Sequence, residues 1–159
     1  MIRIVLSRQE GSGRVGCGCT CGEIDRLMCT NVGDSRLRDK GQLLLIGTCM
    51  NTRFPEIVEE FKVKDGGYAV LHICLEENHV NQAGFKIGSI VRYSEIKKIT
   101  VLTIDGSPHC VQLHFVVEDL RRHFTPEIET VHFVVEKDKV MEVESAAVKR
   151  ARHLSKIEV

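Results

Sequence analysis

The stretch LLLIGTCMNTR, residues 43–53, decides the fold that we expect for this chain. It opens with four consecutive apolar residues, Leu43 to Ile46. Such a short continuous run is typical of a strand that is buried on both faces of a parallel sheet. Cys49 follows three residues after the run. The sequence therefore predicts an α/β fold with a thiol beyond the carboxyl end of one strand.

The residues after this stretch continue as alternating helices and strands. Pro55 suits the first turn of a helix that Gly66-Gly67 ends, and Ser89 is a suitable N-cap for the next helix. A further helix is indicated by apolar residues three and four positions apart: Leu113, Val116, Val117, Leu120 and Phe124. Strands are expected at 43–46, 69–73, 99–104, 131–135 and 140–143, and helices at 55–62, 89–96, 113–124 and 145–154.

This alternation predicts a three-layer α/β fold, in which a mostly parallel sheet has helices on both faces. Right-handed crossovers join such strands, and only the last two strands form a hairpin, which turns at Lys137-Asp138. The composition changes near Gly41. We therefore expect a glycine- and cysteine-rich N-terminal segment at 1–42 and an α/β domain at 43–159.

The composition narrows the classes of function. The chain has 22 basic and 22 acidic side chains, and this balance favours neither a nucleic-acid partner nor an anionic membrane surface. No stretch approaches the roughly 20 apolar residues that cross a bilayer, so we expect a cytoplasmic protein. Seven cysteines in a reducing compartment indicate metal, cluster or redox chemistry rather than a disulfide framework.

Two cysteines follow predicted strands and are the first candidates for a site. Cys49 comes three residues after Ile46, and Cys110 comes six residues after Ile104. Neighbouring strands lie about 4.8 Å apart, so loops that leave their carboxyl ends can bring two thiolates to one metal ion. His109 and His114 are nearby candidate ligands, and the expected metal is zinc. The alternative is that both cysteines are buried structural residues.

At these residues the sequence resembles the β-carbonic anhydrases. Cys49-Met50-Asn51-Thr52-Arg53 is similar to the Cys-Met-Asp-Ser-Arg motif of that family, and Gly106-Ser107-Pro108-His109-Cys110 is similar to its second ligand motif. The likeness covers residues 43–143. It implies that Cys49, Cys110 and a histidine hold zinc, that the residues at positions 51 and 53 act in catalysis, and that the protein is a homodimer.

Two departures from the family pattern argue against efficient hydration of CO2. Ser107 stands where the resembled family has its ligand histidine, which leaves His109 as the nearest substitute. Asn51 stands where the family has the aspartate that pairs with Arg53. We therefore expect a divergent metal site that binds a small molecule or an anion. If the protein is an enzyme, the resemblance implies a zinc-dependent lyase.

The N-terminal cysteines form a second candidate site. Cys17, Cys19 and Cys21 are separated by single residues in a glycine-rich stretch, and Cys29 follows eight residues later. Glycines let a backbone fold closely around sulfur, which suits an iron-sulfur cluster for electron transfer or sensing. Cys29, Cys49 or Cys74 would supply a fourth ligand. The other hypotheses are exposed thiols without a ligand, redox-active thiols, and a scaffold that acts by association.

Overall fold

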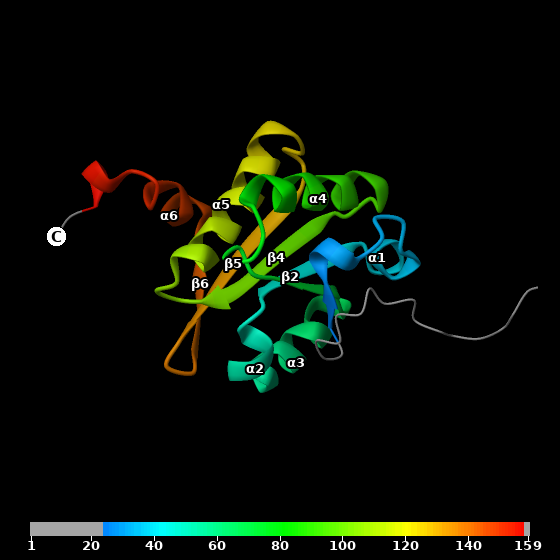
Figure 1. Cartoon of the computed structure of the whole chain (residues 1–159), viewed down its shortest axis with the longest axis horizontal. Coiled ribbons are helices and arrows are strands. Elements are labelled where there is room, and N and C mark those ends of the chain that lie inside the picture. The colour runs from blue at the N-terminus through cyan, green and yellow to red at the C-terminus, as the bar shows by residue number, and fades with distance from the viewer. Residues whose placement is uncertain (1–23, 158–159) are drawn as a thin grey trace, which may run out of the picture.

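The structure is a computed structural model of the chain, and it describes residues 24–157. These residues form a six-stranded sheet in the order β1-β3-β2-β4-β5-β6 (Figure 1). The parallel strands are β1 (Asp25–Arg26), β2 (Gln42–Gly47), β3 (Ala69–Ile73), β4 (Lys98–Ile104) and β5 (Glu129–Glu136). The last strand, β6 (Lys139–Val143), pairs with β5 in the antiparallel direction.

Helices cover both faces of this sheet. The longer helices are α3 (Pro55–Val63), α4 (Val80–Tyr93) and α5 (Pro108–His123). The shorter ones are η1 (Leu27–Cys29), α1 (Ser35–Lys40), α2 (Met50–Arg53), η2 (Lys64–Gly66), α6 (Ser145–Arg150) and η3 (Leu154–Lys156). The expected three-layer α/β fold is confirmed.

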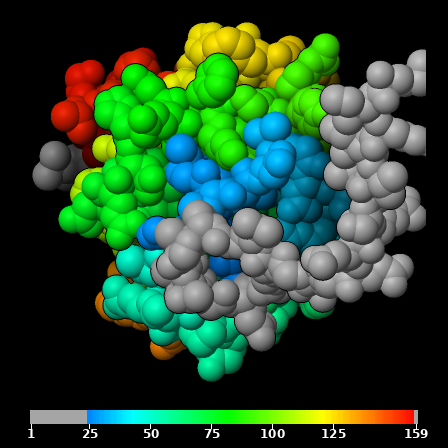
Figure 2. All heavy atoms as spheres, turned by 45° about the vertical axis from the view of Figure 1, so that its right-hand side comes forward, coloured from blue at the N-terminus to red at the C-terminus, as the bar shows by residue number. Residues whose placement is uncertain are grey.

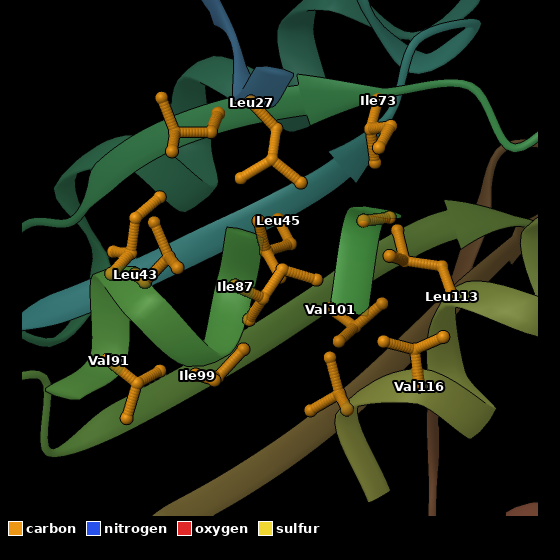
Figure 3. Packing of buried hydrophobic residues seen from close by; sticks show 14 of the residues in the cluster. Leu27, Leu43, Leu45, Ile73, Ile87, Val91, Ile99, Val101, Leu113 and Val116 are labelled. Carbon is orange, nitrogen blue, oxygen red and sulfur yellow. The ribbon is translucent and has the colours of Figure 1, made fainter. Parts of the chain in front are cut away.

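The central strand β2 supplies side chains to both layers of the core. Leu43 and Leu45 point toward α4 and α5, where they pack with Ile87 and other labelled residues (Figure 3). Leu44 and Ile46 point to the other face and belong to the cluster under α3. All four apolar residues of β2 are fully buried. Burial of each such side chain contributes about 2 kcal/mol, so this strand forms the centre of the molecule.

Residues 25–40 are part of the same fold. η1 follows β1 at the edge of the sheet and lies beside α4 (Figure 2). Leu27 of η1 is fully buried in the core cluster under α4. The Ser94 hydroxyl donates a hydrogen bond to the carbonyl oxygen of Val32, at 2.7 Å. The part of the N-terminal segment that the structure describes thus packs on the sheet.

Strands β2 to β6 lie within two residues of their predicted bounds, and the hairpin turns at Lys137-Asp138 as expected, but β1 was not predicted. Both turn residues have positive φ, 48° and 63°, which matches the right-handed twist of a two-residue hairpin. The final helix, in contrast, ends at Arg150, four residues before the predicted end at Leu154. α2 was not predicted, and α5 begins five residues earlier than the apolar pattern indicated.

The helix predicted at 89–96 is present, but it begins nine residues earlier than predicted. The structure has α4 at Val80–Tyr93, and its N-cap is His79, whose side chain accepts a hydrogen bond from the Asn81 N–H. Two glycines, Gly84 and Gly88, lower the intrinsic helix propensity of this segment. Packing of α4 against the sheet and α5 outweighs that local preference.

Candidate functional site

The chain leaves β2 and β4 toward opposite faces of the sheet. The segment after β2 runs through α2 to α3 on one face, whereas the segment after β4 enters α5 on the other. These two strands are neighbours in the sheet. Where adjacent connections part in this way, open α/β sheets commonly bind ligands beyond the carboxyl ends of the strands. The loops at 48–49 and 105–107, with the starts of α2 and α5 that follow them, lie at this position, which is the candidate ligand crevice.

Cys110 brings its sulfur against the end of β2. A Cβ atom on Gly47 would lie 3.3 Å from Cys110 Sγ and 3.8 Å from Thr103 Cγ2. Gly47 is the last residue of β2 and is buried. A side chain at position 47 would push against the sulfur, so glycine is what allows this close approach. Cys110 is partly buried and forms no disulfide.

The start of α5 positions Cys110. Ser107 is the N-cap, and its hydroxyl oxygen accepts a hydrogen bond from the Cys110 N–H at 3.4 Å. Pro108 occupies the first turn, where a missing N–H does no harm. Gly106, with φ of 78°, makes the sharp turn between β4 and the helix. Cys110 therefore lies in the first turn of a 16-residue helix.

Two buried polar atoms, one in α2 and one in β3, have no hydrogen-bond partner. Thr48 Oγ1 lies 3.0 Å from His72 Nδ1, but His72 Nε2 is buried and has no hydrogen-bond partner. Asn51 Oδ1 is also buried and without a partner. Burial lowers the pKa of His72, and the positive charge of Arg26 lowers it further, so both favour the neutral ring. Buried polar atoms are nearly always satisfied in proteins, so these two leave hydrogen-bonding capacity for a bound group.

Of the other predicted site residues, Cys49 and Arg53 are exposed at the two ends of α2. The Arg53 guanidinium carbon lies 5.8 Å from the centre of the Phe54 ring. His109 lies in the first turn of α5, with Nδ1 at 3.9 Å from Glu76 Oε2. Cys74 directly follows β3. These residues border the carboxyl edge of the sheet but point to different neighbours.

The described residues do not gather a metal site. Within residues 24–157, no three His, Cys, Asp or Glu side chains converge on a position for one ion. Cys29, at the end of η1, is exposed. Cys17, Cys19 and Cys21 lie outside the residues that the structure describes. Zinc and the iron-sulfur cluster therefore stay predictions from the sequence.

A chain of buried polar side chains runs behind Cys110, between α5 and the sheet. Thr103 Oγ1 lies 2.8 Å from His114 Nε2, His114 Nδ1 lies 3.0 Å from His132 Nδ1, and His132 Nε2 lies 2.9 Å from Glu118 Oε1. None of these four residues is more than 4% exposed. Both nitrogens of His114 are engaged. His114 is therefore not available as the metal ligand that its spacing from Cys110 had indicated.

Burial sets the charge states along this chain. It lowers the pKa of His114 to about 3, with a further contribution from His132. Burial also lowers the pKa of His132, although the hydrogen bond and negative charge of Glu118 act to raise that pKa. For Glu118, burial raises the pKa, but hydrogen bonds led by those from Arg121 and His132 outweigh it and bring the value to about 2. At neutral pH the chain thus contains two neutral imidazoles and one carboxylate.

A family model described as a Rossmann-like domain matches residues 35–158. The chain belongs to that family. No curated protein and no solved structure gave a match. No helix among residues 24–157 combines the length and apolar character needed to cross a membrane.

The family match overturns the resemblance to β-carbonic anhydrases. In this Rossmann-like domain Ser107 caps α5 instead of standing in for a metal ligand. The likeness of the two motifs has a physical source, since many parallel sheets need a strand, a tight loop and a helix start at the same edge. The homodimer rested on this resemblance and has no other support here.

Sequence reasoning missed three of the four residues in the buried chain: Thr103, Glu118 and His132. One signal was available, because Cys110, His114 and Glu118 recur four positions apart and so share a face of a helix. The strand residues gave no such signal. Thr103 and His132 meet His114 only because β4 and β5 pair in parallel beneath α5.

Proposed function

We propose that this Rossmann-like domain binds a small molecule in the crevice between the loops after β2 and β4, and that the Cys110 sulfur reacts with it as a nucleophile. The observation that carries the proposal is the position of Cys110 Sγ against Gly47, at the point where the two connections part. Cysteine is intrinsically a strong nucleophile. A partly buried thiol in a ligand crevice is placed to use that property.

Unused hydrogen-bonding capacity beside the crevice supports the binding of a polar molecule. Asn51 Oδ1, in the helix that follows the loop after β2, and His72 Nε2, in β3, are buried without partners. A bound polar group would satisfy atoms of this kind, whereas leaving one unsatisfied costs about 1 to 3 kcal/mol. Cys49, in the same loop, offers a second and more exposed thiol.

Alkylation by iodoacetamide tests the reactivity of Cys110. The sulfur forms a bond to carbon, the carbon–iodine bond breaks, iodide leaves with the electron pair, and the thiol loses its proton. We expect the Cys110 peptide, followed by mass spectrometry, to be modified faster than glutathione although this cysteine is partly buried. A rate below that of glutathione would show an unactivated thiol and contradict the proposal.

Ligand binding is tested by melting the protein with a panel of mononucleotides and dinucleotides. A compound that binds the folded state raises the melting temperature. In the proposed site it also slows alkylation of Cys110 and leaves the rate at the exposed Cys29 unchanged. Equal protection of both cysteines, or protection of neither by a compound that stabilises the protein, would place the binding site elsewhere.

Metal binding needs a separate measurement on the full chain. Analysis of anaerobically purified protein for zinc, iron and sulfide tests the ions predicted from the sequence. Replacement of Cys49 and Cys110 by Ser, compared with replacement of Cys17 and Cys19, then shows which cysteines bind the ion.

A further inference from the structure

The buried chain described above begins at Thr103, whose methyl group lies near the same end of β2 as the Cys110 sulfur, and it ends at the carboxylate of Glu118. Cys110, His114 and Glu118 lie on one face of α5, one turn apart, so the three residues span about 12 Å along the helix. Thr103 and His132 reach it from β4 and β5. Polar side chains are rarely buried in this number without a role, because each costs free energy unless it is fully satisfied.

The hydrogen bonds of the chain can have only one direction at neutral pH. The ionised Glu118 can only accept, so His132 donates from Nε2 and its Nδ1 carries no proton. The bond between the two imidazoles then requires His114 to donate from Nδ1. His114 Nε2 is left as an acceptor, and the Thr103 hydroxyl donates to it. Every proton in the chain is thus directed toward Glu118.

We propose that this chain is a proton relay that serves Cys110. The proposal rests on the proposed nucleophilic function of that cysteine. As the thiol becomes the attacking thiolate, its proton passes to Thr103 Oγ1, and each group gives its own proton to the next. The Thr103 hydroxyl proton moves to His114 Nε2, the proton of His114 Nδ1 moves to His132 Nδ1, and the proton of His132 Nε2 moves to Glu118. Both imidazoles end neutral, and the negative charge moves from the carboxylate to the sulfur.

The first step of the relay requires Cys110 Sγ to approach Thr103 Oγ1. Cys110 Sγ and the Thr103 methyl carbon Cγ2 lie 3.3 and 3.8 Å from the position that a Cβ of Gly47 would take, and Thr103 Oγ1 is engaged with His114. Proton transfer therefore requires rotation of the Cys110 side chain, a fast motion for a partly exposed residue.

The surroundings of Glu118 favour the carboxylate between turnovers. Arg121 donates to Oε2 at 2.8 Å, while Thr130 and Ser145 donate to Oε1 at 2.7 and 3.0 Å. Of these groups only Arg121 is charged. The loops after β2, β3 and β4 carry the titratable side chains Cys49, Cys74, Glu76, Glu77, His79 and Asp105, and the first turn of α5 adds His109. Arg152 of α6 pairs with Asp119 on another face of α5.

The relay is tested by alkylating Cys110 in the Glu118→Gln variant of the full chain. Glutamine has nearly the same shape but cannot take up the proton. General acid–base groups typically contribute at least 100-fold to a rate, so we expect alkylation by iodoacetamide at neutral pH to slow by about tenfold or more. The matched control is Thr130→Val, which removes one hydrogen bond to the same Glu118 oxygen and leaves the relay intact. Its rate should stay within about twofold of wild type.

Two results would overturn the relay. One is a folded Glu118→Gln variant with the wild-type rate at Cys110. The other is equal slowing in Thr130→Val, because the chain would then act only as a structural brace. Neither result would contradict the proposed function, because that function depends on the reactivity of Cys110 in the wild-type protein. Slow alkylation of wild-type Cys110 would instead remove both proposals.

A measurement on the unmodified protein keeps the proposal testable if Glu118→Gln does not fold. Nitrogen-15 NMR distinguishes a protonated ring nitrogen from a bare one. At neutral pH we expect the proton on Nε2 of His132 and on Nδ1 of His114. A proton on Nε2 of His114 would reverse the direction of the chain and overturn the relay.

Discussion

Gly47 is the residue at which the sheet and the candidate site meet. Its lack of a side chain lets the Cys110 sulfur pack at the end of β2, and a Cβ atom would meet that sulfur at 3.3 Å. Cβ contacts this short are rare, so the neighbour has to move. The φ angle of Gly47 is not positive, so any residue could adopt its backbone conformation. Glycine is needed at this position because the Cys110 sulfur occupies the space of a side chain.

We expect Gly47→Ala to destabilise the protein by about 1 to 2 kcal/mol, as overpacking of a filled core usually does. Urea unfolding measures the loss. The control is the same substitution in a Cys110→Ala background, where the sulfur is absent and most of the loss should disappear. An equal loss in both backgrounds would mean that contact with the sulfur does not cause it.

The buried histidines predict a loss of stability in acid. His114 has a pKa of about 3 when folded, because burial disfavours its charged form, against 6.5 when unfolded. Below pH 6.5 the unfolded chain therefore binds a proton that the folded chain excludes. The free energy of unfolding consequently decreases as the pH decreases. Glu118 adds to this loss between its ordinary value of 4.5 and about 2, since the unfolded carboxyl is protonated first.

Urea unfolding at several pH values measures this effect. His114 alone should reduce the free energy of unfolding by roughly 3 kcal/mol between pH 7 and pH 4. His114→Gln should flatten the dependence, while His123→Gln, at an exposed position, should not. The same slope in the His114→Gln variant and in wild type would contradict the assignment.

At the scale of elements, α4 shows how packing replaces local preference. Gly84 and Gly88 lie on the side of the helix that faces α5, with Val116 and Leu120 as neighbours. Between the two helices is an apolar groove of about 880 Å³ that both glycines border. α4 therefore combines a weak helix sequence with close approach to its neighbour.

Gly84→Ala is expected to stabilise the protein by up to about 1 kcal/mol, because alanine favours a helix by that amount. Its Cβ would lie 3.5 Å from Val116 Cγ1, an ordinary contact. Gly88→Ala is the matched comparison and should gain less, since its Cβ would lie 3.3 Å from Leu120 Cδ2. Urea midpoints rank the two, and a loss of stability in Gly84→Ala would refute the expectation.

At the scale of the whole molecule, the core extends beyond the matched Rossmann-like region. The family match begins at residue 35, but β1 and η1 precede it. β1 pairs with β3 and extends the sheet by one strand. Leu27 is fully buried in the cluster under α4. These early elements should unfold together with the sheet.

Leu27→Ala tests this cooperativity. Removal of a buried leucine typically costs 2 to 5 kcal/mol, so we expect a loss of about 3 kcal/mol in a single transition measured by circular dichroism. Leu154→Ala, at a position that is 82% exposed, should change stability by less than about 0.5 kcal/mol. If Leu27→Ala changed the free energy of unfolding as little as Leu154→Ala, then β1 and η1 would not unfold as part of the domain core.

The sequence by itself determined the layers of the fold and the edge of the sheet where the thiols lie. Leu43 to Ile46 is apolar without interruption because β2 is buried on both faces, and Cys49 and Cys110 follow strands that the pattern identified. Only the tertiary structure decided which side chains meet. His132 meets His114 because β5 pairs with β4 and because α5 turns the His114 side chain toward these strands. A local sequence pattern cannot show that two residues so far apart along the chain are neighbours in the fold.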